Sequence, residues 1–540
     1  MTDTTALLLA AAYGAPLVLA LACAVPGLRR LALALAPYAP VPALLAALDA
    51  LTLGRIAART PLLGLNFYLD APGAVLMAAA AALWIAAGVA AGPLRAGDNG
   101  LRFTIGWLLT LAGGMGVFAA TDLVTFYFVF ALVSLPAYVL ITHDGSARAL
   151  RAGVVAIAFA LFGEAILLLG LALLAAGEPS GSLYIADVMA ALPDSPFAAP
   201  AVALTVAGLA MKMALPPMHG YLPLAYTAAP PAAAAALSAA GVNAGVIGLI
   251  RFVPFETGLP GLSEALTAAG LFAAFYGVAL GLLQRNPKTI LAYSSVSQMG
   301  VLAAVVGMGL SAEDPAALIQ TAFYGANHLL VKGALFLGVG AAAARGGRRV
   351  LILAPAILLA LNLGGLPLTG GGLAKLAVKD TLGSFVVGWL AAFSAAGTTL
   401  LMLHFAGRLA SVEAEAPAAG RRRAELGWFS AVAAAVFLPY LFFPIVGQPI
   451  DAAFAPAALV DGLWPVLLGA ALAFALRRAG DALPHVPPGD LVVVEEAGVM
   501  ALARVGAMVE RAEYAMRRWP AAAMALVALI VAFGVAFASG

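Results

Sequence analysis

A lysine and two prolines lie inside one apolar run of the sequence. Residues 198–230 read AAPAVALTVAGLAMKMALPPMHGYLPLAYTAAP, with Lys212 near the middle and Pro216 and Pro217 just after it. Prolines remove helical hydrogen bonds, and a lysine in lipid needs a partner or loses its proton, so both features are costly in a bilayer. The run therefore predicts an interrupted helix around a buried amine that can exchange a proton.

Other ionisable side chains also lie within apolar segments. His328 and Lys332 are four residues apart in FYGANHLLVKGALFLGVG, so they share one helix face, and an imidazole next to an amine suits a proton relay. Glu164 lies deep in VAIAFALFGEAILLLG, where it either pairs with the lysine of the interrupted helix or stays neutral and bonds a neighbouring helix. His219 and His404 either extend this polar series or serve in packing. No zinc site is expected, because no Cys, Asp or Glu lies at a suitable spacing.

A second apolar segment is interrupted in a similar way. Residues 351–380 read LILAPAILLALNLGGLPLTGGGLAKLAVKD and break at a Gly-Gly pair, at Pro367 and at three consecutive glycines. Lys375 and Lys379 follow directly. The two breaks are about 150 residues, or five apolar spans, apart. An odd number of spans inverts the second copy relative to the first, which predicts an inverted repeat whose broken helices meet at the membrane midplane.

The composition excludes a water-soluble globule. Hydrophobic residues make up 64% of the 540 residues, charged residues only 10%, and the mean hydropathy is +1.03. Sixteen apolar segments of about 20 residues each, the length that crosses a bilayer, lie between residues 5 and 538. We expect an all-α polytopic membrane protein with about 14–16 transmembrane helices. The single cysteine, Cys23, excludes an internal disulfide and a thiolate metal cluster.

The loops between the expected spans differ in charge. If the N-terminus faces outward, alternate loops hold 21 basic residues on the inside, and the intervening outside loops hold three. This asymmetry predicts that both termini face out. The three outside residues are Arg55, Arg59 and Arg251. The four remaining basic residues are the lysines at 212, 332, 375 and 379, which lie within or against apolar segments.

Three regions are expected along the chain. Residues 1–100 form N-terminal transmembrane helices, and residues 101–410 form the proton-translocating core. Within that core the two inverted five-helix repeats cover about 103–253 and 262–407. Residues 411–540 form C-terminal transmembrane helices with an amphipathic segment at the cytoplasmic interface, which includes Arg504, Arg511, Arg517 and Arg518.

Several of these motifs resemble those of one known family. KMALPPMHGYLPLAYTAAP, NPKTILAYSSVSQMG and FYGANHLLVKGALFLGVG are similar to the conserved segments of the antiporter-like membrane subunits. This family contains the D and A subunits of Mrp-type cation/proton antiporters and the proton-pumping membrane subunits of respiratory complex I and of membrane-bound hydrogenases. The resemblance covers about residues 100–410. It implies a core of fourteen helices with two inverted five-helix repeats and a central hydrophilic axis of Lys, His and Glu.

The resemblance assigns a proton pathway residue by residue. Matches to the family pattern are Lys212, His219, His328 and Lys332, and Lys375 lies about one residue from the family's second broken-helix lysine. Three positions depart from the pattern, because Ala131 replaces a glutamate, Asn243 replaces a lysine and Gln298 replaces a histidine. The predicted pathway consists of Lys212, His219, Glu164, His328, Lys332, Lys375, Lys379, His404, Asn243 and Gln298.

The missing glutamate leaves two interpretations open. Glu164, one span after Ala131, substitutes for it, or the chain is an altered, non-pumping subunit that mainly serves as a scaffold. We expect the first, in a multisubunit monovalent cation/proton antiporter of the bacterial cytoplasmic membrane. Its partners would be other membrane subunits, protons, and Na⁺ or K⁺, with no nucleic acid.

The alternatives share the same fold. They are a pump subunit of a complex I-like or hydrogenase-linked complex, which would be a translocase without its own redox centre, or an inorganic-carbon-uptake partner. No catalytic residue, cofactor or metal is expected in this chain, because no nucleotide, flavin, iron–sulfur or quinone motif is visible.

Overall fold

The computed structural model describes residues 3–52, 60–62, 64–97, 99–255, 259–343, 350–383, 385–412, 421–479 and 486–489. The chain divides into two compact units, 1–488 and 489–540, and everything below concerns the first. Its elements in chain order are α1 (Asp3–Ala24), α2 (Arg29–Leu35), η1 (Ala36–Tyr38), α3 (Val41–Thr52), β1 (Thr60–Leu62), β2 (Leu65–Phe67), α4 (Ala71–Ala90), α5 (Gly92–Ala96), α6 (Gly100–Val117), α7 (Leu123–Ser134), α8 (Ala137–Ile141), α9 (Ala147–Ala176), α10 (Ile185–Ala190), η2 (Leu192–Asp194), α11 (Ala198–Lys212), α12 (Tyr221–Ala228), α13 (Pro231–Phe252), α14 (Leu262–Leu282), α15 (Pro287–Ser311), α16 (Ala316–Ala343), α17 (Val350–Gly364), α18 (Gly370–Leu382), α19 (Val386–Ala410), α20 (Arg421–Phe442), η3 (Phe443–Val446), η4 (Ile450–Phe454) and α21 (Pro456–Ala479).

The all-α membrane fold is confirmed. Within the described residues, 13 helices are long and apolar enough to cross a membrane, and the shorter apolar helices α11 and α17 are the first halves of the two interrupted spans. Together these helices account for fifteen of the sixteen predicted spans. The sixteenth, at 519–538, and the amphipathic segment before it lie outside the described residues. The strands β1 and β2 form one short antiparallel hairpin.

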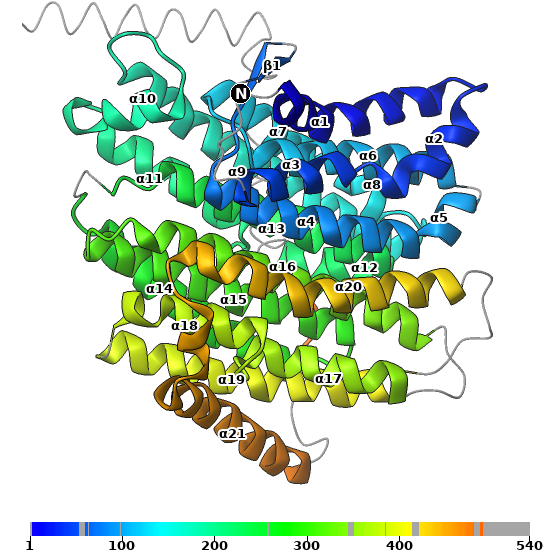
Figure 1. Cartoon of the computed structure of the whole chain (residues 1–540), viewed down its shortest axis with the longest axis vertical. Helices are drawn as coiled ribbons and strands as arrows, with labels where there is room; N and C mark the ends of the chain where they lie inside the picture. The colour runs from blue at the N-terminus through cyan, green and yellow to red at the C-terminus, as the bar shows by residue number, and fades with distance from the viewer. Residues whose placement is uncertain are drawn as a thin grey trace, which may run out of the picture. The chain divides into compact units, whose positions relative to one another are not determined.

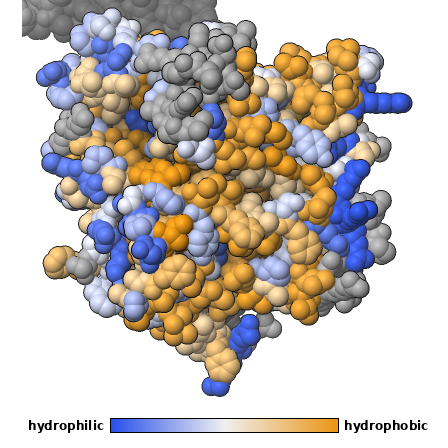
Figure 2. Space-filling model, viewed as in Figure 1, coloured by the Kyte–Doolittle hydropathy of each residue, from blue (hydrophilic) through white to orange (hydrophobic). Residues whose placement is uncertain are grey.

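The long helices run side by side, and they differ strongly in burial (Figure 1). α13 and α15 are buried along almost their whole length, whereas α9, α14 and α21 are buried over less than half of theirs. The outer helices carry exposed apolar side chains such as Phe162, Phe272 and Phe474. Figure 2 shows a broad apolar area on one face, with hydrophilic residues gathered at opposite edges. This distribution matches helices whose outer surface contacts lipid and whose inner surface can hold polar groups.

Two consecutive sets of helices repeat the same order. The first set is α6, α7 with α8, α9, α11 with α12, and α13. The second is α14, α15, α16, α17 with α18, and α19. The fourth member of each set is broken, as the sequence predicted. The exact repeat boundaries at 103–253 and 262–407 remain a prediction.

Both breaks begin with the same backbone turn. Ala214 has φ +57° and Gly365 has φ +93°. The amide of Ala214 donates to Met211 O at 3.0 Å, and the amide of Gly365 donates to Asn362 O at 2.8 Å. In each case the next amide bonds the carbonyl five residues earlier at 3.0 Å. This is the Schellman pattern, which ends a helix by satisfying its last carbonyls, and a proline follows two residues later at both sites.

Glycine allows a close helix contact in the second set. A Cβ atom at Gly270 of α14 would lie 2.5 Å from the carbonyl oxygen of Gly300 on α15, and a Cβ at Gly300 would lie 2.4 Å from the carbonyl oxygen of Gly270. Such short distances exclude any side chain. Small residues let helix backbones approach closely in membranes, where packing rather than water drives association. The contact holds α15, which carries several polar side chains, against α14.

Candidate functional site

Lys212 is the last residue of α11, immediately before the first break. The chain turns at Ala214, passes the cis peptide bond between Pro216 and Pro217, and begins α12 at Tyr221. The Tyr221 hydroxyl donates to the backbone oxygen of Lys212 at 3.0 Å. Because this carbonyl lies at a helix end, it lacks an intrahelical donor, and the tyrosine supplies one. The break therefore fixes the backbone that carries the lysine.

The Lys212 amine contacts polar groups from two other helices. Its Nζ donates to Ser134 Oγ on α7 and lies 3.4 Å from Glu164 Oε1 on α9. Ser134 Oγ donates to the same carboxylate oxygen. The Lys212 Nζ also lies 3.4 Å from Phe130 O and 4.3 Å from the centroid of the Phe130 ring. The lysine side chain is 10% exposed and the glutamate side chain 5%, so this is a buried ion pair bridged by a hydroxyl.

A small cavity lies beside this ion pair. Its volume is about 80 Å³, and Lys212, Glu164 and Ser134 are among its lining residues. Most of its wall is apolar, but a cavity of this size has room for water, and these three side chains offer a water molecule polar partners. The arrangement can hold one proton near the amine, the hydroxyl or the carboxylate, and it gives water a place to meet them.

His328 and Lys332 lie on α16 and are completely buried. Lys332 Nζ donates to the backbone oxygen of Leu291 on α15 at 2.8 Å. Neither ring nitrogen of His328 has a hydrogen-bond partner in the described part of the chain. Asn243 on α13 faces the same helix, since its Oδ1 lies 3.4 Å from where a Cβ of Gly325 would be. The interior around α16 therefore holds an amine, an imidazole and an amide away from lipid.

Further polar contacts connect α16 with α19. The hydroxyl of Tyr324 donates to Gln298 Oε1 at 2.8 Å, and Gln298 Nε2 donates to Thr398 Oγ1 at 3.0 Å. All three side chains are buried, with at most 3% of their surface exposed. Gln298, which stands where the motif resemblance predicts a histidine, thus joins two hydroxyl groups. A glutamine cannot change its charge, but its amide can relay a hydrogen bond.

Lys375 lies on α18, just beyond the second break, and reaches back across it. Its Nζ donates to the backbone oxygen of Gly364 at 2.7 Å. Gly365 makes room, since a Cβ there would lie 2.5 Å from Lys375 Cδ. The two broken-helix lysines are therefore not in equivalent places, because Lys212 precedes its break and Lys375 follows its own.

A cavity of about 360 Å³ adjoins Lys375. Its lining residues also include Gln298, Thr398, Lys379 and Asp461. Lys379 forms an ion pair with Asp461 of α21, and both side chains are about half exposed. The ion-pair partner of Lys379 is thus on a distant helix, although Asp380 is its neighbour in the sequence. The cavity links buried polar groups to an exposed ion pair.

Two predicted residues remain, His219 and His404. The His219 ring is buried and packs against Tyr276 and Tyr293, with ring centroids 5.0 Å and 6.1 Å away. His404 Nε2 lies 2.9 Å from the backbone oxygen of Gln284, in a separate pocket where α14, α19 and α21 end.

Residues that the sequence reasoning missed complete the site. Ser134, Tyr221, Tyr324, Thr398 and Asp461 all contact a predicted pathway residue or line the cavity beside Lys375. For Ser134, the sequence contained one signal. Ser134 lies three residues after Ala131, hence on the same helix face as the position where the motif resemblance predicts a glutamate.

Comparison with known proteins identifies the family. The family described as NADH:quinone oxidoreductase/Mrp antiporter, TM matches residues 120–401, just over half of the chain. This chain belongs to that family. The match includes both broken helices and all of α15 and α16.

Relatives in this family come from different complexes. NADH-quinone oxidoreductase subunit N of Desulforudis audaxviator (strain MP104C) is 33% identical over 338 residues, which cover 58% of this chain and 65% of that protein. Hydrogenase-4 component B of Escherichia coli (strain K12) is 33% identical over 232 residues, 41% of this chain and 34% of that protein. The chain thus spans between about one third and two thirds of the length of these relatives.

A solved structure has the same fold. A chain in the Mrp complex from Dietzia sp. DQ12-45-1b matches with a TM-score of 0.72 and 21% sequence identity, over 99% of this chain and 63% of that chain. This protein carries Ala131 where the motif resemblance predicts a glutamate. It nevertheless has a carboxylate near the first lysine, supplied by Glu164 of the next long helix.

Proposed function

We propose that this protein is the proton-translocating subunit of a multisubunit monovalent cation/proton antiporter in the bacterial cytoplasmic membrane. The observation that carries the proposal is the buried contact of Lys212 with Ser134 and Glu164. Ionisable groups inside membrane proteins are costly and mark ion pathways by default. The likeness to a chain of an Mrp complex supports the antiporter class.

The first half of the pathway would work by exchange of partners. While Lys212 is charged, Glu164 and Ser134 stabilise it through the ion pair and the bridging hydroxyl. When the amine gives its proton away, the pair loses its attraction, and a new proton entering through the adjoining cavity restores it. Because burial makes an unpaired charge expensive, the two protonation states differ strongly in energy. Glu164 would in this way take over the role of the glutamate that Ala131 replaces.

The second half would carry the proton from the interior to the outside. Lys332 and His328 would receive it in the centre, with Asn243 nearby. Gln298 and its two hydroxyl partners would pass it toward Lys375. The cavity beside Lys375 would then release it past Lys379 and Asp461. His219, buried just after the first break, would extend the polar series of the pathway.

The region assignments follow from the same proposal. Residues 101–410 would form the translocating core, and the helices before and after it would support the core and contact neighbouring membrane subunits. Na⁺ or K⁺ would be the exchanged cation.

A pump subunit of a complex I-like or hydrogenase-linked complex is the second candidate. The observation that favours it is the 33% identity to relatives named as NADH-quinone oxidoreductase subunit N and hydrogenase-4 component B. The genes next to this one distinguish the candidates, since small antiporter subunits would favour exchange and dehydrogenase or hydrogenase subunits would favour a redox-driven pump.

Replacing Lys212 by alanine tests the proposal directly. The complex that contains this chain is purified with its natural partner subunits and reconstituted into liposomes. Proton movement is then followed with a pH-sensitive dye after a Na⁺ or K⁺ gradient is imposed. We expect Lys212→Ala to assemble normally and to move protons at the background rate. Normal assembly with full proton movement would overturn the proposal in favour of a scaffold.

A further inference from the structure

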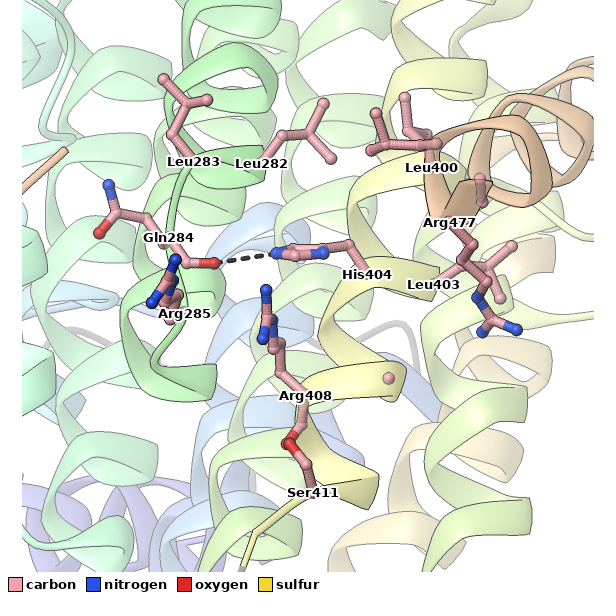
Figure 3. A pocket seen from close by; sticks show the side chains of 13 residues that line it. Leu282, Leu283, Gln284, Arg285, Leu400, Leu403, His404, Arg408, Ser411 and Arg477 are labelled. Atoms are coloured by element: carbon pink, nitrogen blue, oxygen red, sulfur yellow. Dashed lines mark hydrogen bonds between the residues drawn. The ribbon is translucent and has the colours of Figure 1, made fainter. Parts of the chain in front are cut away.

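A pocket separate from the proposed pathway lies where three helices end. It has a volume of about 310 Å³ and is formed by the C-terminal ends of α14, α19 and α21 (Figure 3). His404 of α19 reaches across to the backbone oxygen of Gln284, which follows α14, at 2.9 Å. This hydrogen bond closes one wall of the pocket and ties α19 to the connection between α14 and α15.

Three arginines from three different segments line this pocket. They are Arg285 after α14, Arg408 in the last turn of α19 and Arg477 in the last turn of α21. Figure 3 shows the Arg285 and Arg408 side chains next to each other below the His404 hydrogen bond, and Arg477 on the side of Leu403. Among the described residues that line the pocket, none is a carboxylate. Within the described ranges, none of the three guanidinium groups has a hydrogen bond or an ion pair.

Helix ends alone do not explain this arrangement. An arginine in the last turn stabilises the helix dipole, but this effect does not require three guanidinium groups to line one hollow, where like charges repel. The neighbouring Arg478 gives a contrast, because its guanidinium lies 4.7 Å from the centroid of the Phe474 ring and does not line the pocket. An anion inside the pocket would remove the repulsion and satisfy several donors at once.

The rest of the wall is apolar. Five leucines line the pocket, and all of them are only partly buried. They are Leu282, Leu283, Leu400, Leu403 and Leu476. By the charge pattern of the loops, this end of the helices faces the cytoplasm. A soluble anion would gain nothing from leucines, whereas the acyl chains of a phospholipid would cover them while the phosphate meets the arginines.

We propose that this pocket binds the headgroup of an anionic phospholipid, with its phosphate between Arg285, Arg408 and Arg477. Basic pockets between helices on the cytoplasmic side suit anionic headgroups. The bound lipid joins α14, α19 and α21, and so fastens α21 to the core. Among the described residues, His404 is the one predicted pathway residue that lines this pocket, and the lipid test below does not measure transport, so failure of one proposal leaves the other standing.

Lipid binding to the purified full-length chain, with the subunits that accompany it, tests this site. The protein is delipidated in detergent, titrated with phosphatidylglycerol, and analysed by native mass spectrometry for the fraction that carries lipid. The triple variant Arg285→Gln, Arg408→Gln, Arg477→Gln should bind the tightest phosphatidylglycerol roughly a hundredfold more weakly, at roughly fivefold per arginine. The matched control Arg478→Gln removes one positive charge from the same turn of α21 and should bind as the wild type does.

Three results would overturn the proposal. They are equal binding by the triple variant, equal binding of phosphatidylcholine by the wild type, and displacement of phosphatidylglycerol by inorganic phosphate, which would make this a site for a soluble anion. If the triple variant does not fold, photoactivatable phosphatidylglycerol is used on the wild type. Cross-links to peptides that contain residues 282–285 or 400–411 support the site, and cross-links only elsewhere refute it.

Discussion

Replacing Glu164 by glutamine removes one charge from the proposed pathway and keeps the side chain's size. In the wild type the carboxylate accepts a hydrogen bond from Ser134 and lies 3.4 Å from Lys212 Nζ. Both partners of this pair are almost completely buried. Breaking a buried ion pair by removing one partner costs roughly 3–5 kcal/mol, because it leaves the other charge uncompensated. This free energy now disfavours the charged form of Lys212, so the amine can no longer be reloaded with a proton.

The expected effect on transport is large. A penalty of that size lowers the ratio of charged to neutral Lys212 by roughly a hundredfold or more. Dye-monitored proton movement in liposomes should therefore fall to background while the complex still assembles. Glu264→Gln is the matched control, because its carboxylate is exposed at the start of α14, and it should transport as the wild type does. Unchanged transport by Glu164→Gln would refute the reasoning.

A second change tests whether the position of the acid matters. Ala131 lies one turn before Ser134 on α7, at the place where the motif resemblance predicts a glutamate. The double variant Ala131→Glu, Glu164→Gln should therefore recover part of the proton movement that Glu164→Gln loses. Recovery would mean that Lys212 needs a nearby carboxylate and tolerates its coming from either helix. If the double variant stays inactive in spite of normal assembly, Glu164 has a role beyond pairing with the lysine.

Three further predictions concern the interior. Lys332→Met should leave the melting temperature unchanged or raise it, because an apolar side chain of similar length replaces a buried amine that has one backbone partner. The same variant should stop proton movement. If it still transports, this amine is not part of the pathway. Gly365→Ala should lower the free energy of unfolding by roughly 1–3 kcal/mol and disturb Lys375, whose Cδ lies 2.5 Å from the new Cβ position. Gly447→Ala is the control, because Gly447 also has a positive φ (+82°) but no atom of the described residues lies within 4 Å of its Cβ position. Equal transport by the two variants would contradict a role for the contact between Gly365 and Lys375. Arg251→Met should lower the melting temperature, because the Arg251 guanidinium holds the carboxylate of Asp70, which caps α4. The transport rate of the protein that remains folded should not change. A transport defect at unchanged stability would argue against this purely structural role.

Much of the fold could be predicted because its determinants are local. Apolar segments of bilayer length identified fifteen spans that the described residues contain, and prolines and glycines identified both breaks. The equivalence of the breaks was less complete than the sequence indicated. The turns at Ala214 and Gly365 match, but Lys212 and Lys375 lie on opposite sides of their breaks. Side-chain position around a break depends on how the second half-helix packs, and a motif does not report this.

By itself, the sequence determined the class of protein and the number of described spans. It also determined the two interruptions and the residue types that lie within apolar surroundings. These features are local, because hydropathy and backbone restrictions act over a few neighbouring residues. Only the tertiary structure decided which groups meet. In the tertiary structure Glu164 contacts Lys212, 48 positions away in the sequence, and Asp461 contacts Lys379, 82 positions away. His404 lines a different pocket from the two cavities beside Lys212 and Lys375. Such contacts depend on which helices become neighbours, and packing between helices selects these neighbours only when the whole bundle forms.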